Sequence, residues 1–143
     1  MQPIDLYGAA LLAALTLTLA SCSASPSATE KPRAMTLEKG MNGAPNRITL
    51  SAKAAQRLSL QLGTVSAAPG NRLRVPSSAV FYDSDGSTWV YANPTALTFV
   101  RHAVSLERIS GPVTLLITGP ALGSRVVTVG VPELQGADAG IGY

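Results

Sequence analysis

From about residue 47 onward, the chain is a series of short apolar runs, most of them followed within a few residues by Gly or Pro. The 143-residue sequence holds 13 Gly, 10 Pro and few charged residues, a composition that favours short strands and turns over long helices. The runs are "RITL", "SLQLGTV", "VPSSAVFY", "STWVYA", "LTFVRHAVSLERI", "PVTLLIT" and "SRVVTVG". We therefore predict an all-β domain, a small antiparallel roll or barrel of six to seven short strands.

One short helix is expected inside this domain. Ser51 is a typical N-cap and precedes "AKAAQRL", whose apolar residues recur on one face of two helical turns. The terminal segment "PELQG" is expected to complete the domain without adding a second helix. These limits place the folded domain at residues 47–136 and a C-terminal tail at residues 137–143.

The segment "DSDG" separates two apolar runs and predicts a β-hairpin. Gly86 follows Asp85, and glycine adopts the positive φ that tight hairpin turns require. Asp83 and Asp85 are interpreted as turn residues whose carboxylates bind nearby backbone groups, in preference to a Ca²⁺ site.

The strand after this hairpin has an irregular alternation. In "LTFVRHAVSLERI" Phe99 and Arg101 share one phase, whereas Val104 and Leu106 share the other. A bulge near residues 102–103 would bring the two halves into one strand.

The only cysteine of the chain follows an apolar stretch near the N-terminus. Residues 6–20 are too short and too often interrupted to span a bilayer, but they have the length of the apolar core of a signal peptide. Residues 19–22 read Leu-Ala-Ser-Cys and resemble the bacterial lipobox, although "MQPID" carries no Lys or Arg. We predict a lipoprotein signal peptide at 1–21 and lipidation of Cys22. A structural cysteine in an apolar N-terminal helix is the alternative.

Residues 22–46 are predicted to be a flexible, lipid-anchored tether. Pro, Ser, Gly and isolated charges dominate this stretch, and it has no apolar period. Met35 and Met41 lie within it, and their thioethers would suit Cu(I). Two methionines without a nearby His or Cys are more often incidental.

The inventory of reactive side chains argues against an enzyme. His102 is the only histidine and lies in a predicted strand without a carboxylate at a suitable spacing, and one cysteine cannot build a disulfide framework or a Cys-based zinc site. We therefore expect no catalytic residues, no cofactor and no metal. Arg72 and Arg74 are the nearest approach to a basic cluster, and they lack an aromatic platform, which argues against nucleic-acid binding.

The order of the strand motifs resembles the C-terminal end of periplasmic adaptor subunits, also called membrane fusion proteins, of RND-type efflux pumps. The similarity runs through "VPSSAVFYDSDGSTWVYAN", "LTFVRHAVSLERI" and "GPALGSRVVTVGVPELQG". The matching positions are Val75, Pro76, Ala79, Val80, Val90, Tyr91, Phe99, Arg101, Val104, Gly123, Arg125, Val126, Val127 and Gly130.

The N-terminal part of the domain is also similar to this family, but the chain is much shorter than an adaptor. "ITLSAKAAQRLSLQLGTV" resembles the strand and helix that precede the lipoyl domain, and it departs at Ser59, where a helix-ending Gly is usual. Full adaptors place a lipoyl domain, an α-helical hairpin and a β-barrel between the two segments, whereas here only "SAAPGN" lies there. The resemblance implies a membrane-proximal domain alone.

The resemblance implies that the protein docks, without catalysis, on the periplasmic side of an RND-type inner-membrane transporter. Its own copies or a full-length adaptor are further possible partners. The lipid anchor would hold it on the outer face of the inner membrane or on the periplasmic face of the outer membrane. Alternatives are a lipid-anchored module for a small ligand or a metal, unrelated to efflux, and a degenerate adaptor remnant.

Four residues are candidates for docking on a partner: Trp89, Tyr91, Phe99 and Arg101. Alternation places Trp89 and Tyr91 on one face of their strand, with Val90 on the other. If only one face packs on the core and Val90 points into it, the two aromatic rings form an outward pair. The alternative puts Trp89 in the core.

Overall fold

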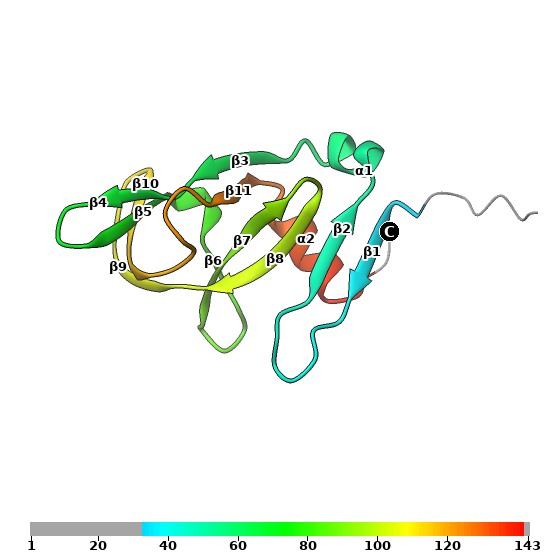
Figure 1. Ribbon diagram of the computed structural model, residues 1–143, viewed down its shortest axis with the longest axis horizontal. Helices are drawn as coiled ribbons and strands as arrows, with labels where there is room; N and C mark the ends of the chain where they lie inside the picture. The colour runs from blue at the N-terminus through cyan, green and yellow to red at the C-terminus, as the bar shows by residue number, and fades with distance from the viewer. Residues whose placement is uncertain (1–32, 142–143) are drawn as a thin grey trace, which may run out of the picture.

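The computed structural model describes residues 33–141, and these form two antiparallel sheets and two α-helices (Figure 1). The first sheet has the order β1-β2-β8-β7-β11-β3, and β6 pairs with β7. Its strands are β1 (Met35–Glu38), β2 (Arg47–Leu50), β3 (Gln61–Thr64), β6 (Phe81–Tyr82), β7 (Thr88–Thr95), β8 (Thr98–Ala103) and β11 (Arg125–Val129).

The second sheet is smaller and has the order β4-β5-β10-β9. Its strands are β4 (Ser66–Ala68), β5 (Arg72–Pro76), β9 (Ser105–Ser110) and β10 (Val113–Thr118). Figure 1 shows this sheet at one end of the molecule, away from β1 and the short helix α1 (Ala52–Arg57). The predicted antiparallel all-β fold is therefore confirmed, with more strands than expected because several apolar runs are split.

The central strands of the first sheet are buried on both faces. On one face, Tyr91 and Val127 pack in a cluster with Leu134 of helix α2 (Val131–Asp138). On the opposite face, their chain neighbours Val90 and Val126 pack in a second cluster with residues of the smaller sheet. The expectation that only one face of the sheet packs on the core was wrong, because α2 covers the second face.

The run from 98 to 109 is two strands that belong to different sheets. β8 pairs with β7 in regular register from Trp89 opposite Ala103 to Ala92 opposite Val100, so the expected bulge near residues 102–103 is absent there. Val104 lies between β8 and β9, is buried, and donates its N–H to the carbonyl of Thr88. The change of phase in the sequence therefore marks the point at which the chain passes from one sheet to the other.

The hairpin and the first helix follow the predicted turn and cap chemistry. Gly86 has φ +82° in the turn that joins β6 to β7. Asp85 Oδ1 accepts bonds from the N–H and Oγ of Ser87, as a turn residue does. Ser51 Oγ accepts the Ala54 N–H at 3.2 Å and caps α1.

The ordered elements extend beyond the predicted domain limits at both ends. β1 lies within the predicted tether and pairs with β2 from Met35 opposite Leu50 to Glu38 opposite Arg47. "PELQG" lies in α2, whose first turn carries a proline and which continues through Asp138 into the predicted tail. The folded unit thus spans at least 35–138 instead of 47–136. In the part of the chain that the structure describes, no helix is long and apolar enough to cross a membrane.

Candidate functional site

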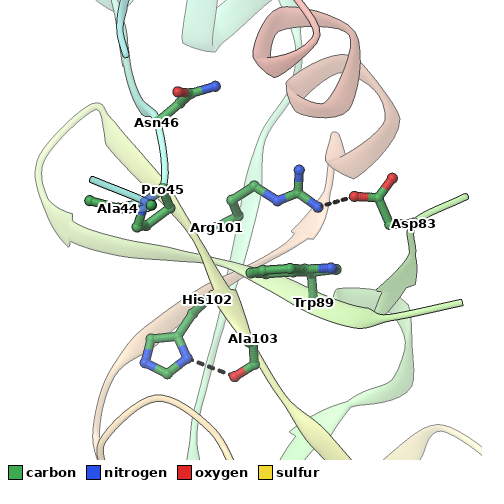
Figure 2. Close-up of a pocket in the computed structure, with 9 residues that line it drawn as sticks. Ala44, Pro45, Asn46, Asp83, Trp89, Arg101, His102 and Ala103 are labelled. Atoms are coloured by element: carbon green, nitrogen blue, oxygen red, sulfur yellow. Dashed lines mark hydrogen bonds and ion pairs between the residues drawn. The ribbon is translucent and has the colours of Figure 1, made fainter. Parts of the chain in front are cut away.

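A hollow of about 560 Å³ opens beside β7 and β8, and Figure 2 shows the side chains that line it. Its walls are the loop between β1 and β2 (residues 43–46), Asp83 from the β6–β7 turn, Trp89 from β7, and residues 101–103 from β8. Strand pairing brings these segments together. Trp89 on β7 is paired with Phe81 of β6 on one side and with Ala103 of β8 on the other.

Arg101 is the central side chain of this site. Its guanidinium carbon lies 4.3 Å from the centroid of the Trp89 ring and 5.8 Å from that of Phe81, which is cation–π geometry. Nη2 donates to Asp83 Oδ2 at 2.5 Å, and Nη1 lies 3.5 Å from Asp138 Oδ2. Figure 2 shows the guanidinium above the indole ring and pointing toward Asp83.

Asp138, near the end of α2, joins this cation to the rest of the fold. Its side chain is only 5% exposed. Oδ2 accepts a hydrogen bond from the Tyr91 hydroxyl at 3.2 Å, and Oδ1 accepts one from Asn46 Nδ2 at 2.8 Å. One carboxylate therefore ties together the β1–β2 loop, β7, β8 and α2.

Ion pairs and burial shift the pKa values of three groups in this cluster. Burial alone would lower the pKa of Arg101, but the hydrogen bond to Asp83 and the charges of Asp138 and Asp83 outweigh it and raise that pKa. The Arg101 hydrogen bond, with one from the Ser84 N–H, lowers the pKa of Asp83. Burial, and then the negative charge of Asp138, raise the pKa of the Tyr91 phenol above its ordinary value.

Two of the four predicted docking residues lie at this site, and two lie in the core. Arg101 and Trp89 line the hollow, and both are partly exposed. Tyr91 shares its sheet face with Trp89, as alternation predicts, but it is 1% exposed, and Phe99 is 3% exposed. Their burial in the core leaves the rings of Tyr91 and Phe99 almost no surface to offer a partner.

Sequence reasoning missed the carboxylates that hold Arg101. Asp83 was interpreted only as a turn residue, and Asp138 was placed in the tail. The register of the predicted hairpin would have brought Asp83 near the next strand, but nothing local connects Asp138 to Arg101, because that contact depends on how α2 packs.

The remaining reactive residues do not converge on a metal site. His102 is exposed, with Nδ1 2.9 Å from the carbonyl oxygen of Ala103. Among residues 33–141, no group of three or more His, Cys, Asp or Glu side chains could hold a metal ion. Cys22 lies outside the described residues.

No protein-family model, no curated protein and no solved structure matches this chain.

Proposed function

We propose that this protein is a lipid-anchored accessory subunit of an RND-type efflux system that docks, without catalysis, on the periplasmic side of the transporter. The order of motifs that resembles the end of adaptor subunits supports the proposal. The observation that carries it is the way in which the two ends of the described chain share one sheet.

The strands before and after the β4–β5 hairpin are interleaved. β2 pairs with β8, and β3 pairs with β11, so the segment from 47 to 64 and the segment from 98 to 129 complete one sheet. The β4–β5 hairpin, whose turn includes Gly70, lies where the resemblance would place the lipoyl, hairpin and barrel domains. A membrane-proximal domain whose inserted domains are replaced by a tight hairpin would have this topology.

The hollow around Trp89 and Arg101 is the surface proposed to contact the transporter. Trp and Arg are the residue types most enriched among side chains that dominate binding energy at protein interfaces. The contacts to Trp89, Asp83 and Asp138 hold Arg101 in one geometry before a partner arrives, which lowers the entropy cost of binding.

Lipidation of Cys22 is proposed to keep this surface near the transporter. Several acyl chains, at about 0.8 kcal/mol for each buried CH₂ group, hold a protein on a membrane almost permanently. The anchor faces the periplasm in this proposal, on either the inner or the outer membrane.

Co-purification from detergent-solubilised membranes tests the proposal. The tagged full chain is expected to bring down a large transporter, whereas Cys22→Ser is expected to lose palmitate labelling and membrane association. Trp89→Ala is expected to reduce the captured transporter. Tyr82→Ala is the matched control, because Tyr82 is an exposed ring on β6 that does not line the hollow. Capture of no transporter by the lipidated wild-type chain would refute the proposal.

A further inference from the structure

A second hollow lies at the opposite side of the domain from the smaller sheet, between α1, α2 and the beginning of β1. Its volume is about 650 Å³, within the range of small-molecule sites. Its lining is mainly apolar: Ala34, Met35, Leu50, Ala54, Leu58, Leu134 and Ala137. We call it the α1–α2 groove.

Helix α1 forms one wall of this groove and is loosely packed. None of its residues is fully buried, and Ala54, which packs against the core, is only partly buried. A helix that keeps much of its apolar face uncovered leaves room for another apolar group to complete its packing.

Two cations stand at the mouth of the groove. Lys53 and Arg57 both line it and both are exposed, and their spacing of four residues puts them on the same side of α1. Within residues 33–141, no carboxylate lies within ion-pair distance of either side chain. An anionic group at the mouth would therefore meet two positive charges that form no ion pair with the described residues.

A carboxylate lies in the lining as well. Glu133, in the first turn of α2, has a buried Oε2 atom that accepts no hydrogen bond from the described residues. Leaving a buried acceptor unsatisfied is unfavourable, so a ligand that places a donor there would be favoured. The groove thus combines an apolar body, a cationic mouth and an unsatisfied acceptor.

We propose that the α1–α2 groove binds one acyl chain of a phospholipid. The phosphate would lie against Lys53 and Arg57, and a hydroxyl or ammonium donor of the headgroup would reach Glu133. These three elements match the chemistry of a glycerol- or ethanolamine-type phospholipid. The anchor's own acyl chains lack a phosphate and would satisfy only the apolar part of the groove.

The first described residues lie at this groove, which limits its distance from the proposed anchor. Ala34 lines the groove, and its carbonyl accepts the Ser51 N–H. If Cys22 carries the proposed anchor, the 11 residues from it to Arg33 reach at most about 40 Å. The inference rests on the proposed function only for the origin of the lipid, because binding itself can be measured without a membrane.

The proposal can be tested by calorimetric titration of the full Cys22→Ser chain with a single-chain phosphatidylglycerol, kept below its critical micelle concentration. The Cys22→Ser change removes the anchor's acyl chains, which could otherwise occupy the groove. We expect saturable binding of one lipid. Ala54→Phe, which fills the groove, should abolish it. Lys53→Glu/Arg57→Glu should weaken it about tenfold or more.

Charge and donor controls separate a built site from general attraction. Lys39→Glu/Arg108→Glu makes the same charge change at exposed positions outside the groove and should leave the affinity unchanged. Single-chain phosphatidylethanolamine and single-chain phosphatidylcholine carry the same net charge, but only the ethanolamine ammonium has N–H donors. The choline lipid should therefore bind more weakly than the ethanolamine lipid, and Glu133→Ala should remove that difference. The inference would be overturned if Lys53→Glu/Arg57→Glu and Lys39→Glu/Arg108→Glu lost the same amount of affinity for the lipid, or if Ala54→Phe bound it as the wild type does.

The two proposals can fail separately. Ala54→Phe in the lipidated chain should capture the transporter like the wild type, because the groove lies apart from the hollow around Trp89. A chain that captures the transporter but binds no phospholipid overturns only the groove inference. A chain that binds phospholipid but captures no transporter overturns only the proposed function.

Discussion

The guanidinium of Arg101 lies over the indole ring of Trp89, with 4.3 Å between its carbon and the ring centroid. The same guanidinium bridges Asp83, on the β6–β7 turn, and Asp138, on α2. A single cation from β8 therefore fixes a turn, a helix and the largest side chain of β7 in one arrangement. The surface proposed for docking depends on this arrangement.

Replacing Arg101 should destabilise the fold through the charge that it leaves behind. In Arg101→Met the Asp138 carboxylate, which is 5% exposed, keeps its hydrogen bonds but loses its cation. We expect a loss of about 3 kcal/mol in the free energy of unfolding, at the low end for a broken buried pair because Asp83 is more exposed. Urea denaturation measures it. Arg108→Met, at an exposed position on β9, should change stability by less than about 0.5 kcal/mol.

The raised pKa of Tyr91 predicts a loss of stability at alkaline pH. Below pH 10 the phenol is protonated in both states, and its contribution is fully present. As the pH rises above the ordinary phenol value of 10.0, the unfolded chain loses this proton while the folded chain keeps it, so unfolding becomes easier. The slope contributed by this one group approaches about 1.4 kcal/mol per pH unit.

Denaturant midpoints at pH 8, 10 and 11 check this effect. Tyr91→Phe should show a shallower alkaline decline than the wild type. At pH 8 it should cost about 1–3 kcal/mol for the lost hydrogen bond to Asp138, and this cost should shrink as the pH rises. Tyr82→Phe changes an exposed phenol and should keep the wild-type decline. Equal slopes in wild type and Tyr91→Phe would contradict the assignment.

The structural features that depend on short stretches of the sequence could be predicted from it. The hairpin at Asp85 and Gly86 depends on turn residues, and α1 depends on the Ser51 cap, so short stretches contain the information. β1 was missed because its alternation offers only Met35 and Leu37 as apolar residues, and the strand is stabilised by pairing with β2. α2 was missed because Gly130 gives it no side-chain cap.

Only part of the candidate site could be predicted from local sequence patterns. Strand composition identified Trp89 and Arg101, but alternation alone could not show that Tyr91 and Phe99 are buried in the core. The contact between Arg101 and Asp138 joins a strand to a helix that the sequence had not predicted. Long-range packing, which no short window contains, decides which of these side chains reach the surface.

A side chain at Gly130 is predicted to destabilise the fold. Its φ is +93°, and a Cβ atom there would overlap Leu60 Cδ2, so the Leu60 side chain, which packs against the core, would have to shift. Gly111 also has a positive φ, of +59°, but a Cβ atom there meets nothing within 4 Å. Gly111→Ala should therefore cost about 1–2 kcal/mol for backbone strain alone.

Gly130→Ala should cost about 1–3 kcal/mol more than Gly111→Ala, because overpacking adds to the strain. Urea denaturation of both variants and of Gly130→Ala/Leu60→Ala measures the two contributions. The double variant should lose less than the sum of its two single changes, because Ala at position 60 frees the space. Strict additivity would show that the contact with Leu60 is not the cause.

Trp89 is predicted to contribute to both stability and docking, since its ring is half-buried. One face carries the Arg101 guanidinium, Nε1 donates to Ser87 Oγ at 2.7 Å, and the ring packs against the cluster that includes Tyr91. Trp89→Ala should cost about 2 kcal/mol, less than the 3–5 kcal/mol of a fully buried aromatic residue, and leave the domain folded. Trp89→Phe should cost less, because a smaller ring still offers a face to Arg101. Urea denaturation and transporter capture, measured on the same preparations, separate the two roles. A Trp89→Ala chain with wild-type stability and wild-type capture would contradict both.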